Sequence, residues 1–286
     1  MSALSEFTTA GDGFDPAPNG QAPATPGLES PSLFGPGNAS DGATAYEVKF
    51  LLTEEQAREA AARVTGKLAL DPYADPALGN AYPIISLYTD TPNFDVFYRT
   101  EGYDRDKFRV RRYGATGPVF VERKTKNGDK VRKQRVRIDV SEVADLNATE
   151  LNAEWAGEWF HSQLLLKQLR PVCRVAYERV AYLGTADGGT VRLTFDRNVR
   201  GVVEREWKID AVGAEVPLLD RVVCEFKFRT AMPALFKGIV ADLGLTPTPV
   251  SKYRTFVPAA GLVPRPAEIV KTGSARVAGE KGSVDA

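Results

Sequence analysis

Charged side chains recur at every second residue in several segments of the sequence, and this spacing could support chemistry on anions. In a β-strand, side chains at i and i+2 lie on the same face, so each segment places its charges together. Bases in such an arrangement can bind an anionic chain, and acids can hold a divalent cation. The residues concerned are Glu47, Lys49, Lys107, Arg109, Arg111, Glu122, Lys124, Lys133, Arg135, Arg137, Glu225 and Lys227.

The pattern is densest in 106–126, which predicts two strands around a turn at 114–118. β-Branched and aromatic residues alternate with long polar ones there, and Gly and Pro interrupt the alternation. For a single hairpin, an ordinary solvent-facing side of a sheet would show the same pattern. Glu-x-Lys recurs in three predicted strands, and this repetition favours charged faces that point into a shared interior.

The elements that must position these residues are mainly strands. Alternation predicts further strands at 46–52, 84–90, 130–140, 171–183, 190–202 and 219–228, with a shorter candidate at 203–210. Helices are predicted at 53–64, where Thr53 and Gln56 form a capping box, and at 150–169 and 232–243. The segment 247–253 is expected to end the ordered region.

About eight strands, mostly joined as hairpins, favour an antiparallel sheet or barrel. Each strand has an apolar face, and the helices carry apolar stripes that must be buried. If the helices pack on the outside of a closed sheet, the charged faces line its interior. We therefore expect an α+β protein with an antiparallel β-barrel and helices packed outside.

Composition separates one domain from two flanking segments. Residues 1–44 lack Lys and Arg and are rich in Gly, Pro, Ser, Thr and Ala, which predicts a disordered leader, and 264–286 predicts a flexible tail. One domain at 45–263 remains. Five of the 37 acidic residues lie in 1–44, which leaves 32 acidic against 37 basic residues in 45–286 and a net charge of +5 for that range. A basic domain favours anionic partners such as nucleic acid, nucleotides or polyphosphates.

Cysteine and histidine content argues against several kinds of site. Cys173 and Cys224 lie in separate predicted strands, which predicts buried thiols in a reducing cytosol. His161 is the only histidine, so a histidine zinc site or a Ser-His-Asp triad is not expected and a structural or surface role is favoured. Neither a Walker A loop nor G-x-G-x-x-G occurs, so a nucleotide must be held without a phosphate-binding glycine loop.

Targeting signals are not evident in the sequence. The first residues lack a basic and apolar signal pattern, and no run approaches the roughly 18 apolar residues that a membrane helix needs. We expect a soluble, cytoplasmic protein with no membrane segment in this chain.

Taken in order, these motifs resemble the VTC domain, the polyphosphate polymerase module of the triphosphate tunnel metalloenzyme (CYTH-like) superfamily. The resemblance covers about residues 45–256. It implies an eight-stranded antiparallel tunnel that binds the triphosphate of ATP, uses Mn²⁺ or Mg²⁺, and transfers the γ-phosphoryl group to a growing polyphosphate chain. The motifs are the three Glu-x-Lys strands, Arg109-x-Arg111, Tyr177-x-Arg179, Arg192-x-Thr194-x-Asp196 and Ser251-Lys252-Tyr253.

The resemblance also implies roles for individual residues. Catalytic positions would be Lys49, Arg109, Arg111, Lys124, Arg179 and Glu225, with Glu225 as the main metal ligand. Substrate binding would add Lys133, Tyr177, Arg192, Ser251 and Lys252, with Arg192 a weaker member.

The sequence departs from the hydrolytic branch of the superfamily in its first and last strands. A full Glu-x-Glu-x-Lys strand would place a carboxylate where this chain has Ala45, and the last strand has Val223. Fewer carboxylates mean fewer metal ligands and fewer groups that activate water, which favours transfer to phosphate over hydrolysis. Glu47 and Glu122 either assist the metal or pair with neighbouring lysines, and we favour pairing.

Three functions remain open from the sequence. A polyphosphate polymerase is favoured, a tripolyphosphatase or nucleoside triphosphatase is the second, and a polyphosphate-binding or nucleic-acid-binding module without turnover is the third. Nucleic acid is disfavoured because exposed aromatic residues do not alternate with the basic strands. ATP and inorganic polyphosphate are the expected ligands, and a membrane partner protein is compatible with the sequence.

Overall fold

A computed structural model describes residues 45–128, 130–210 and 215–263 of the chain. The expected leader at 1–44 and tail at 264–286 lie outside these residues. Within them, ten strands form one sheet: β1 (Ala45–Leu52), β2 (Ala69–Leu70), β3 (Tyr82–Asp90), β4 (Asp106–Tyr113), β5 (Val119–Asn127), β6 (Lys130–Ile138), β7 (Arg170–Ala186), β8 (Gly189–Val203), β9 (Val216–Pro217) and β10 (Val222–Phe228).

Eight of these strands close into a barrel. Its circular order is β7-β3-β4-β5-β6-β1-β10-β8, and the long strands β7 and β8 pair with each other to complete the ring. The two-residue strands β2 and β9 add to β7 and β8. All of the strand ladders are antiparallel. The expected eight-stranded antiparallel barrel is therefore confirmed.

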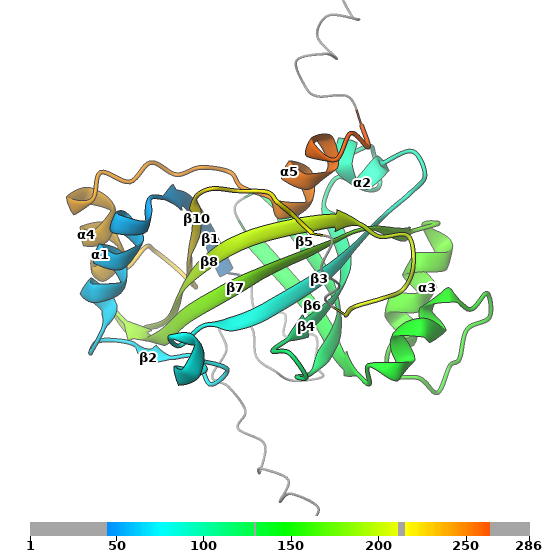
Figure 1. The fold of residues 1–286 in the computed structure, drawn as a ribbon, viewed down its shortest axis with the longest axis horizontal. Coiled ribbons are helices and arrows are strands. Elements are labelled where there is room, and N and C mark those ends of the chain that lie inside the picture. The colour runs from blue at the N-terminus through cyan, green and yellow to red at the C-terminus, as the bar shows by residue number, and fades with distance from the viewer. Residues whose placement is uncertain (1–44, 129, 211–214, 264–286) are drawn as a thin grey trace, which may run out of the picture.

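Helices lie outside the barrel (Figure 1). Figure 1 shows α1 and α4 together at one end of the molecule, α3 at the other, and α2 beside α5. The described helices are α1 (Glu54–Val64), α2 (Asp95–Tyr98), α3 (Glu158–Leu166), α4 (Ala234–Asp242) and α5 (Lys252–Ala259), with short 3₁₀ segments η1 (Pro76–Leu78) and η2 (Ser141–Asn147). No helix among the described residues is long and apolar enough to cross a membrane.

The alternation along β10 explains why the barrel has a charged interior. Cys224 and Phe226 are buried in an apolar cluster with residues of α1 and α4, while Glu225 and Lys227 form ion pairs on the opposite face of the strand. Burial of the apolar face against helices is the main favourable term in folding this wall. The charged side chains are consequently directed inward.

Two secondary-structure predictions were wrong. The helix expected at 150–169 is confined to α3 because Asn152 forms a local turn, its side chain accepting from the Glu154 N–H at 3.1 Å. The strand expected at 203–210 does not form, since β8 ends at Val203 and the Glu204 carboxylate bonds the Glu206 N–H at 3.0 Å. Ordered structure also continues beyond 253, in α5.

Helix α5 approaches the barrel closely at a glycine. A Cβ atom on Gly201 of β8 would lie 2.3 Å from Phe256 Cδ2, so only glycine admits the Phe256 ring at this position. The Ser251 side chain caps the helix by accepting from the Arg254 N–H at 3.4 Å. This docking brings Lys252, the first residue of α5, to the barrel wall.

Candidate functional site

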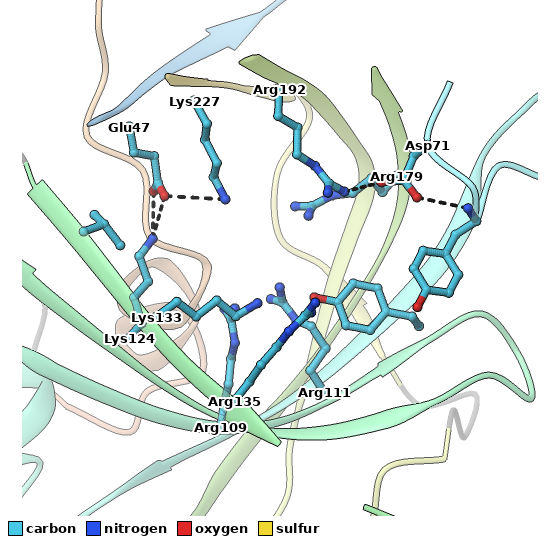
Figure 2. A pocket seen from close by; sticks show the side chains of 13 residues that line it. Glu47, Asp71, Arg109, Arg111, Lys124, Lys133, Arg135, Arg179, Arg192 and Lys227 are labelled. Carbon is cyan, nitrogen blue, oxygen red and sulfur yellow. Dashed lines mark hydrogen bonds and ion pairs between the residues drawn. The ribbon is translucent and has the colours of Figure 1, made fainter. Parts of the chain in front are cut away.

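The barrel interior contains a cavity with a strongly basic wall. Eight of its thirteen lining residues are Lys or Arg, and two are carboxylates. Figure 2 shows the basic side chains converging on this space from different sides of the barrel. The lining residues are Glu47, Asp71, Tyr73, Arg109, Arg111, Tyr113, Lys124, Val131, Lys133, Arg135, Arg179, Arg192 and Lys227.

Two Glu-x-Lys motifs meet on β1 and β10. Because these strands are antiparallel, Lys49 lies opposite Glu225 and Glu47 lies opposite Lys227. The Lys49 ammonium is 3.1 Å from Glu47 and 3.5 Å from Glu225, and Lys227 is 2.7 Å from Glu225. Lys124 of β5 reaches across to Glu47 at 2.8 Å. Charges of opposite sign therefore alternate over this part of the wall.

The third Glu-x-Lys motif supplies the carboxylate at the centre of another basic group. Glu122 of β5 is completely buried and lies between Arg109 of β4 and Arg135 of β6 in the ladder. Arg109 donates to one of its oxygens from Nε at 2.7 Å, and Lys133 approaches the other at 2.5 Å. Glu122 therefore pairs with basic neighbours.

A buried carboxylate on β8 holds the basic residues of β7 and α5. Asp196 accepts two hydrogen bonds from Arg179, at 2.6 and 2.8 Å, and one from Lys252 at 2.6 Å. The Lys252 ammonium also lies 4.3 Å from the centre of the Tyr177 ring. An extra residue near Asn198 shifts the β7–β8 register beside Tyr177, and bulges of this kind commonly re-aim side chains at sites.

Arg111 retains donors for a ligand. Its guanidinium is almost fully buried, and Nε donates to Ser86 at 2.9 Å. Among the described residues, its two terminal nitrogens make no hydrogen bond, although Arg111 lines the cavity. A buried guanidinium with two free terminal nitrogens can bind a phosphate oxyanion in a bidentate manner.

Three glutamates of the site are weak bases. Burial alone would raise the pKa of Glu47, but the three lysines around it lower that pKa to about 2. Burial is likewise outweighed at Glu122, where Arg109 and Lys133 hold the pKa of the carboxyl well below its usual range. The pKa of Glu225 is also held well below its usual range, chiefly by Lys227 against the effect of burial.

Two lysines of the site lose proton affinity. Burial lowers the pKa of Lys124 to about 8, despite the nearby Glu47 carboxylate. Burial lowers the pKa of Lys133 to about 7, despite Glu122. An anionic ligand beside these amines would favour their charged forms.

Nine of the eleven residues expected from the sequence lie in strands of the barrel wall, and Ser251 and Lys252 lie at the start of α5. Six line the cavity: Arg109, Arg111, Lys124, Lys133, Arg179 and Arg192. Lys49, Glu225, Tyr177 and Lys252 contact these residues or one another in the groups described above. Ser251 differs, because its hydroxyl caps α5 and accepts from Lys107 at 3.1 Å rather than lining the cavity.

Several lining residues were not predicted as site residues from the sequence. Arg135 and Lys227 share a strand face with Lys133 and Glu225, so the alternation already contained the signal that could have identified them. Asp71 lies in a loop and pairs with Arg192 at 2.5 Å, a contact for which the sequence offers no local signal. His161 takes the structural role expected of it, buried with Nε2 3.0 Å from the Ala148 oxygen.

The acidic residues suit a metal ion that is bound together with phosphate. Among the described residues, no group of three His, Cys, Asp or Glu side chains could hold a metal by itself. Glu47 and Glu225 lie close enough for each to influence the charge of the other. Mg²⁺ is usually coordinated by one or two protein carboxylates together with phosphate oxygens of the substrate. Glu47 and Glu225 fit that kind of ion.

Comparisons with known proteins place this geometry in context. The family model of the VTC domain matches residues 44–259. No curated protein matches the chain.

Solved structures provide weaker similarities. A Hippeastrum protein assigned as an adenylyl cyclase, and described as having a dominant triphosphatase activity, is 14% identical, with 77% of this chain and 98% of that chain covered and a TM-score of 0.46. A Bacillus halodurans protein provisionally named an adenylate cyclase is 12% identical, with 73% and 95% covered and a TM-score of 0.45. A Pyrococcus horikoshii protein is 16% identical, with 76% and 99% covered and a TM-score of 0.42.

Proposed function

This chain belongs to the VTC domain family, and on that premise we propose that it is a metal-dependent polyphosphate polymerase. It would transfer the γ-phosphoryl group of ATP to an inorganic polyphosphate chain within the barrel. The observation that carries the proposal is the cavity wall, where eight of thirteen lining residues are basic. Catalytic roles are assigned to Lys49, Arg109, Arg111, Lys124, Arg179 and Glu225, and substrate contacts to Lys133, Tyr177, Arg192, Ser251 and Lys252.

Phosphoryl transfer suits this wall because the reaction depends on positioning and charge stabilisation more than on covalent chemistry. Arg111 offers two terminal nitrogens toward the cavity, and Arg179 is held in a fixed orientation by Asp196. Preorganised cations of this kind stabilise the charge that develops on the transferring group. No Ser, Cys or His side chain is among the described residues that line the cavity.

Transfer to phosphate is favoured over hydrolysis by the weak basicity of the glutamates in the wall. A general base that activates water works best with a pKa near the operating pH. The pKa of Glu47 lies at about 2, and that of Glu122 lies well below its usual range. A polyphosphate terminus already carries a negative oxygen and needs no such base.

The family implies a divalent ion, Mn²⁺ or Mg²⁺. Glu225 would hold it, with Glu47 as the nearest second carboxylate. The ion would neutralise charge on the phosphate oxygens and orient them. Lys49, between these two carboxylates, keeps them in place while the site is free of ligand.

The test is incubation of the purified protein with ATP and either Mn²⁺ or Mg²⁺, with products resolved by length on a gel and orthophosphate measured in parallel. Long chains that disappear in Glu225→Gln and Lys124→Ala are the expected result. Arg132→Ala is the matched control, because Arg132 is exposed on the outer face of β6. Unchanged synthesis in both site variants would overturn the assignment.

The same assay separates the alternatives. Orthophosphate without longer chains would identify a tripolyphosphatase or nucleoside triphosphatase. Binding of polyphosphate without either product would identify a binding module.

A further inference from the structure

Lys107 of β4 belongs to the charged face but lies outside the cavity lining. It is directly opposite Lys124 of β5, which is directly opposite Lys133 of β6. Like charges in directly opposed positions destabilise a sheet, so a row of three lysines requires compensation. Lys124 and Lys133 obtain it from Glu47 and Glu122. Lys107 has no carboxylate partner in the described ranges, where its ammonium bonds only the Ser251 hydroxyl, at 3.1 Å.

Other positive charges besides the lysine row act on Lys107. Besides Lys124 and Lys49, the charged groups that act most strongly on it are Arg254 of α5 and Arg99, which ends α2. Burial and these cations lower the pKa of Lys107 well below its usual range. We refer to Arg99, Lys107 and Arg254 as the α2–α5 cluster.

Within the described part of the chain, no ion pair joins a cation of the α2–α5 cluster to a carboxylate. The Arg254 guanidinium donates to the main-chain oxygens of Val96 at 2.7 Å and Phe97 at 3.1 Å. Arg99 is exposed and has a positive φ of 61°. The carboxylate that acts on Arg254 is Asp90, whose oxygens accept from three main-chain N–H groups and the Tyr253 hydroxyl.

Asp90 also makes this arrangement rigid. It accepts from the N–H groups of Val96 and Phe97 in α2, at 2.8 and 2.9 Å, and from Tyr253 in α5. The two helices, which lie side by side in Figure 1, are thereby fixed to β3 and to each other. The backbone positions of Arg99 and Arg254 are thereby held, and a bound anion would offset the positive charge gathered there and favour the protonated form of Lys107.

We propose that the α2–α5 cluster is a second phosphate-binding site, which holds the part of a polyphosphate chain that extends beyond the cavity. This inference rests on the proposed function. The row formed by Lys133, Lys124 and Lys107 connects the two sites, since opposed residues in adjacent strands lie about 5 Å apart. A triphosphate would occupy the cavity alone, whereas a longer chain would also reach the cluster.

The test compares two ligands in the absence of metal and ATP, by titration calorimetry over a range of salt concentrations. The ligands are inorganic tripolyphosphate and long-chain polyphosphate. In Arg99→Ala and in Arg99→Ala/Lys107→Met, affinity for the long chain should fall about tenfold or more, and its salt dependence should decrease by roughly one ion per lost contact. Affinity for tripolyphosphate should change less than twofold in Arg99→Ala. Arg132→Ala should behave as wild type.

The outcomes distinguish this inference from the proposed function. Equal affinity of wild type for both ligands, or unchanged long-chain affinity in both variants, overturns the second site and leaves the polymerase proposal standing. Equal loss of both ligands in Arg99→Ala also overturns it, since Arg99 would then act on the cavity. Failure of wild type to bind tripolyphosphate even after Mn²⁺ or Mg²⁺ is added overturns both. Thermal unfolding of Arg99→Ala, whose mutated side chain is exposed, verifies that the fold is retained.

Discussion

Lys49 of β1 lies directly opposite Glu225 of β10, with 3.5 Å between the ammonium and the carboxylate. The adjacent pair, Glu47 opposite Lys227, has the reverse order of charge. Both carboxylates are therefore neutralised before any ligand arrives. An incoming metal ion and phosphate would replace contacts that already exist, which keeps the wall ordered in their absence.

Glu225→Gln separates metal-dependent activity from phosphate binding. The substitution keeps the shape of the side chain and removes the charge assigned to the metal. Polymer synthesis should fall about 10²–10³-fold, the usual effect of losing one electrostatic contact to a transition state. Metal-free binding of tripolyphosphate should persist or strengthen, because a negative charge has been removed. Loss of that binding would show that Glu225 has a different role.

Neighbouring residues on β6 should differ sharply in their effects. Lys133 lines the cavity, whereas Arg132 is exposed on the outer face. Lys133→Ala should weaken tripolyphosphate binding about tenfold or more, since a charge-assisted hydrogen bond contributes about 1.5–3 kcal/mol. Arg132→Ala should leave the calorimetric affinity within twofold. Similar losses in both variants would contradict an inward-facing Lys133.

Binding of phosphate should weaken as the pH rises above neutrality. Burial lowers the pKa of Lys133 to about 7, so its ammonium deprotonates above that pH in the free protein. The ligand favours the charged form, so binding takes up a proton and affinity declines by up to about tenfold per pH unit. The Lys133 ammonium is also faced by Glu122, Tyr113, Arg135 and Arg109.

Lys133→Arg provides the control for this pH dependence, because arginine remains charged throughout the range. In this variant, the part of the pH dependence of phosphate affinity that comes from Lys133 should be absent. Two other groups should contribute the remainder together with the ligand. They are Lys124, whose pKa burial lowers to about 8, and Tyr113, whose pKa nearby cations lower to about 7 despite burial. Affinity should be measured by calorimetry from pH 6 to 9. The same change of affinity with pH in wild type and variant would rule out titration of Lys133.

Removal of the Glu122 carboxylate should destabilise the protein. Glu122→Gln leaves Arg109 and Lys133 buried without their counter-charge, and breaking a buried ion pair costs about 3–5 kcal/mol. Urea unfolding should reveal this loss, and added tripolyphosphate should reverse part of it by supplying negative charge. Asp210→Asn, at the exposed pair with Arg112, should cost at most about 1 kcal/mol.

The sequence predicted which side chains share a face, because alternation along a strand is a local property. Lys133 and Arg135 could be placed together from β6 alone. The pairing of Glu122 with Arg109 and Lys133 could not, since it depends on the register between strands. The contact between Asp71 and Arg192 joins residues far apart in the chain and has no local pattern.

Errors in secondary structure have similar causes. The apolar repeat at 150–169 resembles a helix, but the turn at Asn152 competes with the first part of it. The approach of Phe256 to Gly201, which helps to dock α5, depends on packing between distant segments. Local patterns thus predict the wall of the barrel better than the segments that close and flank it.

Closure of the ring by β7 and β8 has a consequence for release of product. The ladders run along most of this wall, and only the β1–β6 junction is short, with Ala45–Val131 and Tyr46–Lys130 as its two described pairs. Lengthwise threading is therefore the favoured path for a long occupant. A polymerase with this topology would retain its chain between additions and act processively. Its products would include a few very long chains while most primers remain unextended.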